Sequence, residues 1–112
     1  MCTMPAAATK PKANDDVMRF VMRTRRPRAD KGLTAVSLFS GGGLSDAGYL
    51  AAGYTLVVQS ELEPERAAIG KSNFPDSEWV VGDVRRRVDQ IVKAYRQKES
   101  RPLDLLVATP PC

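Results

Sequence analysis

Residues 34–43, TAVSLFSGGG, decide the fold. A short apolar run leads into Ser40 and three glycines, which is typical of a buried strand that ends in a tight turn. Beyond the turn, apolar residues recur at helical spacing until Gly53 stops the helix; they are Leu44, Ala47, Leu50 and Ala51. A strand, a glycine turn and a helix in this order form the first unit of an open parallel α/β sheet.

The rest of the chain repeats the alternation of strand and helix. Further strands are expected at 54–59, 79–81 and 103–107, and further helices at 64–73 and 84–98. In the last helix, one face carries Val88, Ile91, Val92 and Tyr95. Strands separated by helices imply parallel pairing through right-handed crossovers. The predicted fold class is α/β, the first half of a Rossmann-like sheet with four parallel strands and helices.

Charge divides the chain into two parts, a leader at 1–32 and a small domain at 33–112. The leader carries eight Lys or Arg against three Asp, whereas the remainder carries nine basic against ten acidic residues. Its composition cannot bury much apolar surface, so we expect it to be flexible, although Asn14 could cap a short helix. A basic arm can contact nucleic acid, and it can equally be a solvated arm without a partner.

Targeting and metal-binding signals are missing from the sequence. No apolar run approaches the roughly 18 residues of a membrane span, and residues 1–28 lack the hydrophobic core of a signal peptide. The two cysteines, Cys2 and Cys112, lie at opposite ends and the chain has no His, so a disulfide framework or a zinc or iron site is not expected. We therefore predict a reduced, cytoplasmic protein without membrane contact.

Each junction between a strand and the following helix carries a group suited to a nucleoside. The glycines at 41–43 permit close backbone approach, and the helix after them offers free amides to a carboxylate or phosphate. Glu61 follows the second strand, where it could accept hydrogen bonds from both ribose hydroxyls, although Glu63 competes for this role. Asp83 could accept from an exocyclic amine such as that of adenine. It could equally cap the helix that begins at Val84, and the two roles are compatible.

An NAD-binding domain would use the same glycine turn and acidic residue. In that fold, Asp46 would take the place of the last glycine of G-x-G-x-x-G counted from Gly41, which does not suit a helix start that holds a pyrophosphate. A dehydrogenase would also leave unexplained the Pro-Pro-Cys segment at 110–112 that follows the fourth strand. The dehydrogenase is therefore the less favoured interpretation.

The same segments resemble, in order and spacing, the motifs of the DNA (cytosine-5) methyltransferases over residues 33–112. The similar segments are LFSGGG (38–43) with Gly48 and AGY (52–54) for the first motif, SELE (60–63) and NFP (73–75) for the second, GDV (82–84) for the third, and ATPPC (108–112) for the fourth. In the family, the first motif holds S-adenosylmethionine, and the cysteine of the fourth is the catalytic nucleophile.

The resemblance implies S-adenosylmethionine as cofactor, double-stranded DNA as partner and methylation of cytosine within restriction-modification as activity. Glu61 would bind the ribose, Leu62 would pack on adenine, and Cys112 would add to carbon 6 of a flipped cytosine so that carbon 5 attacks the sulfonium methyl. The implied cofactor-binding set is Phe39, Ser40, Gly41, Gly42, Gly43, Glu61, Leu62, Asp83 and Pro110.

Two departures from the family pattern qualify this expectation. Leu44 stands where most members have another glycine. Members also continue past the Pro-Cys with a Glu-Asn-Val segment, an Arg-rich motif and a target recognition domain. We therefore expect the amino-terminal fragment or subunit of such an enzyme, which needs the carboxyl-terminal half in cis or in trans. Alone it should be inactive, because a terminal carboxylate at Cys112 disfavours the thiolate. The alternative is a non-catalytic cofactor-binding or regulatory module, from a decayed or split methyltransferase.

Overall fold

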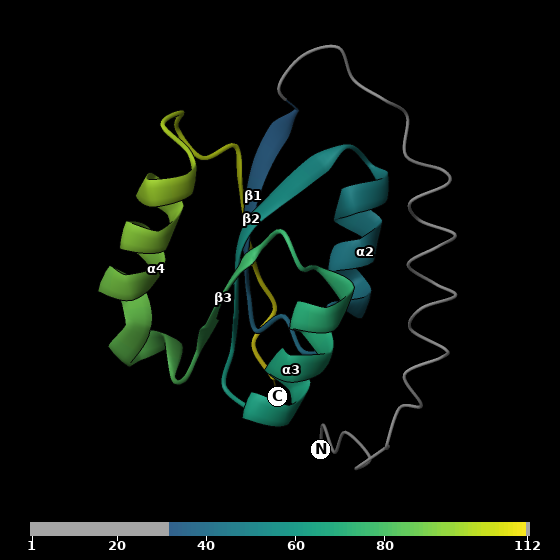
Figure 1. Ribbon diagram of the computed structural model, residues 1–112, viewed down its shortest axis with the longest axis vertical. Coiled ribbons are helices and arrows are strands. Elements are labelled where there is room, and N and C mark those ends of the chain that lie inside the picture. Colours follow the sequence, from purple (N-terminus) through teal and green to yellow (C-terminus); the bar gives the residue numbers. More distant parts are fainter. Residues whose placement is uncertain (1–31, 112) are drawn as a thin grey trace.

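The computed structural model describes residues 32–111 of the chain. The predictions for the leader and for Cys112 therefore concern residues outside the described part. The described residues alternate strictly between strand and helix (Figure 1). The elements are β1 (Leu33–Leu38), α2 (Leu44–Ala51), β2 (Tyr54–Glu61), α3 (Pro64–Asn73), β3 (Glu78–Val81), α4 (Val84–Lys98) and β4 (Leu105–Ala108). The predicted α/β class is confirmed.

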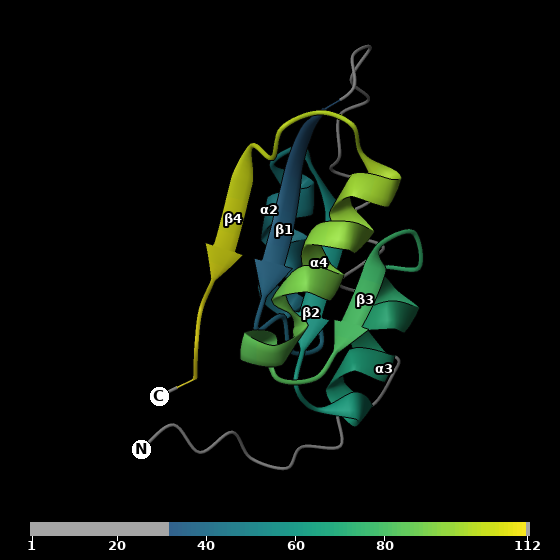
Figure 2. The same ribbon diagram turned by 90° about the vertical axis from the view of Figure 1, so that its left-hand side faces the viewer.

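The strands form one parallel sheet in the order β3-β2-β1-β4. Figure 2 shows the four arrows side by side and pointing the same way. The chain builds outward from β1 through β2 to β3, and then crosses back to add β4 on the other side of β1. Ligands of open α/β sheets bind outside the carboxyl ends of the strands, where the strand order reverses in this way. In this chain that position lies at the ends of β1 and β4.

Helices pack on both faces of the sheet, with α2 and α3 on one side and α4 on the other (Figure 1). Two buried clusters fill the space: Ala35, Ala47, Leu50, Leu56 and Phe74 form one, and Val36, Val57, Val58, Val80, Ile91 and Ala94 form the other. The register of β1 against β2 shifts between Ala35 and Val36, where Val57 is the extra residue. The shift lets Val57 and Val58 both enter the second cluster, and it places Ser37 opposite Gln59.

Several strand boundaries differ from their predicted positions: β2 extends to Glu61, β3 begins at Glu78 and β4 spans Leu105–Ala108. Two boundaries have a clear structural reason. β1 ends at Leu38 because Phe39 adopts a left-handed conformation with φ of 58°, which breaks the extended backbone. β4 begins at Leu105 rather than at 103. The residue before it, Asp104, pairs through its side chain and its backbone N–H with Thr34, so these bonds replace ladder pairing at that position.

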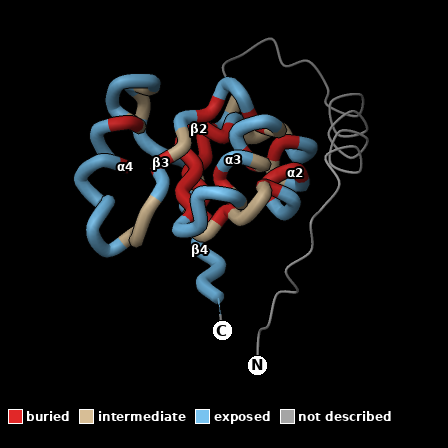
Figure 3. The backbone as a smooth tube through the Cα atoms, turned by 60° about the horizontal axis from the view of Figure 1, so that its bottom comes forward, coloured by how far each residue is buried: buried red, intermediate tan, exposed pale blue. Residues whose placement is uncertain are grey.

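The buried faces of two helices also differ from the predicted ones. In α2, Leu44 is 69% exposed and Ala51 is exposed, whereas Asp46 is buried with Ala47 and Leu50. In α4, Val88 and Val92 are exposed, and Ala94 is buried instead. The helix packs mainly against β2 and β3, so the side of α4 that carries these valines has no strand beneath it. Figure 3 accordingly shows α4 exposed over most of its length.

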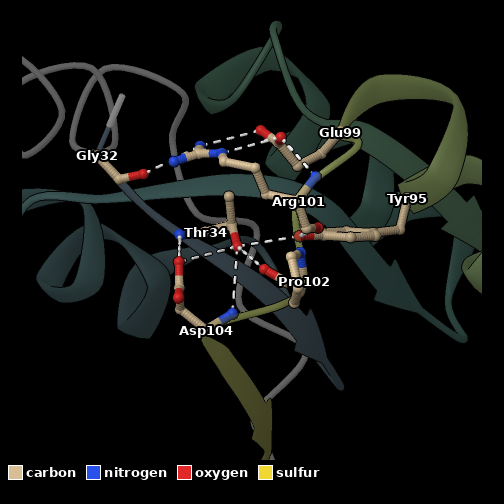
Figure 4. A network of polar contacts seen from close by, with 7 residues as sticks. All are labelled: Gly32, Thr34, Tyr95, Glu99, Arg101, Pro102 and Asp104. Carbon is tan, nitrogen blue, oxygen red and sulfur yellow. Dashed lines mark hydrogen bonds and ion pairs between the residues drawn. The ribbon is translucent and has the colours of Figure 1, made fainter. Parts of the chain in front are cut away.

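A polar network joins the start of β1 to the connection between α4 and β4, at the edge opposite the carboxyl ends of the strands (Figure 4). The backbone N–H of Thr34 donates to Asp104 Oδ2 over 2.7 Å, and the Thr34 hydroxyl lies 3.0 Å from the Tyr95 hydroxyl. Tyr95 in turn donates to the Arg101 carbonyl over 2.9 Å, and Arg101 donates to the Gly32 carbonyl over 3.2 Å. The network fixes the register of β4 against β1.

Replacing Tyr95 with Phe is expected to lower the free energy of unfolding by about 1–3 kcal/mol, because partly buried partners lose a hydrogen bond. Urea denaturation should show an earlier midpoint with an unchanged slope. Tyr49→Phe is the matched control, since no partner of the Tyr49 hydroxyl is found among the described residues. Equal midpoints for the two variants would contradict a stabilising role for the network.

Candidate cofactor site

The loop at 39–43 leaves β1 and enters α2 through three residues in the left-handed region, Phe39, Gly41 and Gly43, with φ of 58°, 59° and 86°. A non-glycine residue held there costs roughly 1–3 kcal/mol, and such strain is concentrated at functional sites. A Cβ at Gly43 would lie 2.5 Å from the ring of Phe74, so this glycine is needed for packing. A Cβ at Gly41 would meet nothing within 4 Å, which leaves that side of the loop open to a ligand.

Hydrogen bonds hold the loop in one conformation. The Ser40 hydroxyl donates to the Ser37 carbonyl and its backbone N–H to the Ser60 carbonyl, both over 2.9 Å. From α3, Asn73 donates to the Gly42 carbonyl over 3.2 Å. The Ser40 hydroxyl thus serves the loop itself. Because the N-cap residue of α2 is Gly43, which has no side chain to cap the helix, backbone amides of the first turn remain available to an anion.

Glu61 ends β2 as a buried carboxylate, with only 7% of the residue exposed. Its Oε2 atom is buried and has no hydrogen-bond partner within the described part of the chain. Glu63 is exposed at the start of α3 and makes no capping bond with its side chain. A buried oxygen without a partner is costly, because it has lost water and gained nothing in exchange. Of the two candidates, Glu61 is therefore the one that needs a ligand.

Leu62 lies directly after Glu61 and is 58% exposed. Gly82, which follows β3, has φ of 131° and donates its N–H to the Glu61 carbonyl over 2.9 Å. The exposed apolar side chain of Leu62 and the backbone of Gly82 therefore both lie next to Glu61. A flat apolar ligand face could pack on Leu62.

Asp83 caps α4, as predicted, by accepting from the Arg85 backbone N–H over 2.9 Å. The Arg85 guanidinium also pairs with the carboxylate over 2.7 Å. The side-chain hydrogen bond from Arg85, reinforced by its backbone N–H, lowers the pKa of Asp83 to about 2. Any amine that binds Asp83 must compete with this guanidinium. The Arg85 side chain is largely exposed, so it can move away into solvent.

Acid is expected to weaken α4 through Asp83. Its pKa is lower in the folded chain than its ordinary value of 3.8, so its contribution to stability is present above that value and is lost as the pH falls toward about 2. Helicity measured from pH 5 to pH 2 should show this loss. Asp83→Asn keeps a capping oxygen but no charge, so it should remove that part of the acid dependence. An identical acid profile in the two proteins would contradict the assignment.

Strand topology brings the predicted residues to one edge of the sheet. Phe39 follows β1, Glu61 ends β2, Asp83 follows β3 and Pro110 lies exposed beyond β4. Three strand spacings separate β3 from β4, about 14 Å at the usual distance between neighbouring strands. Such an edge can hold an elongated ligand with different polar groups along its length. Cys112 lies two residues beyond Pro110, outside the described residues.

One buried group beside this edge was not predicted as part of the site. Asp46 in α2 is 1% exposed and accepts hydrogen bonds from Ser37 on β1 and Gln59 on β2. Its spacing of four residues from Leu50 is the signal that would have placed it on the buried face of the helix. The apolar pattern concealed it, because Leu44 at the same helix start is hydrophobic but exposed.

Comparison with known proteins identifies the family. The model of the C-5 cytosine-specific DNA methylases matches residues 33–112. The chain belongs to this family. It is 32% identical over 77 residues to the type II methyltransferase M.AquIA of Picosynechococcus sp., and 31% identical over 84 residues to the type II methyltransferase M1.HgaI of Avibacterium volantium. These matches cover 69% and 73% of the chain but only 31% and 23% of the two relatives, so the chain spans a third of their length or less.

One solved structure agrees with this assignment, and a second one shares the fold. A DNA modification methyltransferase encoded within an E. coli prophage matches 71% of the chain and 23% of its own, with 30% identity and a TM-score of 0.63. An O-methyltransferase from Bacillus cereus in complex with SAH matches 94% of the chain and 47% of its own at 17% identity, with a TM-score of 0.54, which shows a shared fold. The predicted sheet of the S-adenosylmethionine-dependent methyltransferases is thus confirmed.

Residues 32–111 lack a membrane-spanning helix and a cluster of metal ligands. No helix there is long and apolar enough to cross a membrane. In the same residues, no three His, Cys, Asp or Glu side chains gather as metal ligands would.

Proposed function

We propose that residues 33–112 form the cofactor-binding part of a DNA (cytosine-5) methyltransferase, which transfers a methyl group from S-adenosylmethionine to carbon 5 of cytosine in DNA. The observation that carries the proposal is the buried Oε2 of Glu61, which has no partner among the described residues at the ligand-binding edge of the sheet. A ribose supplies the two neighbouring hydroxyl donors that such a carboxylate lacks.

The other residues of the edge fit the remaining parts of the cofactor. The open side of Gly41 and the uncapped amides of α2 suit the carboxylate of its methionine end. Leu62 would pack on adenine, and Asp83 would accept from the adenine amine in place of Arg85. Phe39, Ser40, Gly42 and Gly43 would shape the loop, and Pro110 would border the methyl group. When bound, the cofactor supplies an electrophilic methyl group on a sulfonium sulfur.

Cys112 would carry the covalent chemistry. Its thiolate adds to carbon 6 of a cytosine that has left the duplex, which makes carbon 5 nucleophilic. Carbon 5 then takes the methyl group, and the electrons of the broken carbon–sulfur bond stay on the sulfur of the departing cofactor. A base outside residues 33–112 would take the proton from carbon 5, and the Cys112 sulfur would leave carbon 6 as thiolate, which releases 5-methylcytosine. Pro110 and Pro111 would restrict the backbone just before the nucleophile.

The chain would share this work with a portion outside residues 33–112, in cis or in trans. The matched relatives are more than three times as long as the matched segment. We propose that groups which protonate the ring and read the DNA sequence belong to that portion, and that the basic leader at 1–32 contacts the DNA backbone. Without these groups, residues 33–112 would bind cofactor without methylating DNA.

Calorimetric titration of the chain with S-adenosylmethionine, and separately with NAD, tests the proposal. We expect saturable binding of S-adenosylmethionine and none of NAD at the same concentration. Both molecules carry an adenosine, so the difference would come from the methionine end and from the glycine loop. Tighter binding of NAD than of S-adenosylmethionine would contradict the proposed function and favour the dehydrogenase interpretation.

A further inference from the structure

Asp46 is a fully buried carboxylate at the junction of three elements. It lies in the first turn of α2, where one oxygen accepts from the Ser37 hydroxyl of β1 over 2.6 Å. The other oxygen accepts from the Gln59 amide of β2 over 2.7 Å. No basic side chain pairs with it within the described part of the chain. The cluster of Asp46, Ser37 and Gln59 therefore holds a buried carboxyl group whose hydrogen-bond donors are both neutral.

Stability alone does not explain such a cluster. Burial of a polar carboxyl group carries a desolvation penalty, which hydrogen bonds from two neutral donors offset only in part. Within the described part of the chain, Gln59 Oε1 is also buried without a hydrogen-bond partner. An apolar residue at position 46 would avoid the first cost, but it would leave the Ser37 hydroxyl and the Gln59 amide without their acceptor. The carboxyl group of Asp46 fixes the position of α2 relative to the sheet, because each of its oxygens binds a different strand.

Each donor lies two residues before a residue of the proposed site, Ser37 before Phe39 and Gln59 before Glu61. Ser37 and Gln59 are paired across β1 and β2. Side chains two residues apart on a strand point to the same face, so the side chains of Gln59 and Glu61 lie on the same face of β2. Ser37 accepts the Ser40 hydroxyl through its carbonyl, so it also holds the glycine loop. Asp46 thus connects the loop, the end of β2 and the start of α2.

We propose that Asp46 is a positioning residue for the cofactor: it sets the glycine loop and the Glu61 carboxylate at the separation that S-adenosylmethionine requires. The proposal rests on the proposed function of the site. Asp46 acts through Ser37 and Gln59 and does not touch the ligand.

Three variants of the chain separate positioning from general stability. Asp46→Ala leaves both donors without an acceptor. Asp46→Asn keeps an acceptor for Ser37, and its amide can donate to Gln59 Oε1 once the glutamine amide turns over. Tyr95→Phe is the control, because it weakens the network at the opposite edge of the sheet. Each is titrated with S-adenosylmethionine, and its unfolding midpoint is measured.

We expect Asp46→Ala to weaken S-adenosylmethionine binding roughly tenfold, the size expected when buried hydrogen-bond donors are left without their acceptor. Asp46→Asn should recover most of the affinity, and Tyr95→Phe should lose stability with its affinity unchanged. Equal affinities for the wild type and Asp46→Ala, or an equal loss in Tyr95→Phe, would overturn the proposal. Should Asp46→Ala fail to fold, Ser37→Ala removes one donor and should show a smaller loss in the same direction.

Amide hydrogen exchange without ligand distinguishes failure of this inference from failure of the proposed function. In Asp46→Ala the amides of Ser40 and Gly43, which bond to Ser60 and Ser40 carbonyls, should exchange faster, and in Tyr95→Phe they should not. If the wild type does not bind S-adenosylmethionine, the proposed function is wrong, and with it the cofactor role of Asp46. If the wild type binds but the loop amides of Asp46→Ala exchange as in the wild type, only the positioning role is wrong.

Discussion

Replacing Cys112 with Ser is expected to abolish methyl transfer in an enzyme that contains this chain. A suitable enzyme is a chimera of residues 1–112 followed by the part of M1.HgaI beyond its matched segment. A serine hydroxyl is a far weaker nucleophile than a thiolate toward carbon 6 at neutral pH, so turnover should fall by a factor on the order of 10⁴ or more. Transfer of a labelled methyl group to DNA measures the loss.

Trapping on DNA that contains 5-fluorocytosine assigns the nucleophile directly. The fluorine cannot leave carbon 5 as a proton, so the adduct between protein and DNA should persist in the unmodified chimera. Cys2→Ser is the matched control, since it removes the other cysteine of the chain and should leave the adduct intact. An adduct that still forms with Cys112→Ser, or that maps to a peptide without Cys112, would show that the role proposed for this cysteine is wrong.

Glu61→Ala is expected to weaken S-adenosylmethionine binding by about 1–3 kcal/mol, which is roughly 5- to 150-fold in the dissociation constant. The reason is the loss of a buried acceptor for the ribose hydroxyls. Glu61→Gln keeps one carbonyl acceptor and should fall between the two. Calorimetric titration of the folded chain gives all three affinities.

Glu61→Ala should leave the free energy of unfolding unchanged or raise it slightly. In the free chain, Oε2 of Glu61 has no partner among the described residues, so removing it relieves a desolvation penalty. Loss of affinity without loss of stability is the signature of a ligand-binding residue. Glu63→Ala is the control, because Glu63 is exposed and should affect neither quantity. If Glu63→Ala lost affinity instead, the ribose contact would belong to Glu63.

Local features of the sequence determined most of the secondary structure. The helix at 64–73 agrees with α3, and the helix at 84–98 agrees with α4. The capping role of Asp83 was also predicted, because a cap depends only on the residues that directly follow it. The family was identified from the order and spacing of short motifs, which a single sequence displays in full. The role of Cys112 stays a prediction.

Only the tertiary structure decided which of these residues are buried and what they meet. The sheet order places β4 beside β1, and no local pattern encodes that neighbour. The choice of Glu61 over Glu63 follows from burial, which depends on elements far away in the sequence. Asp46 looked like a departure from a glycine motif, yet it binds side chains from two strands. Periodicity shows that a helix has an apolar face, but the packing partners decide where that face ends and which polar group is buried beside it.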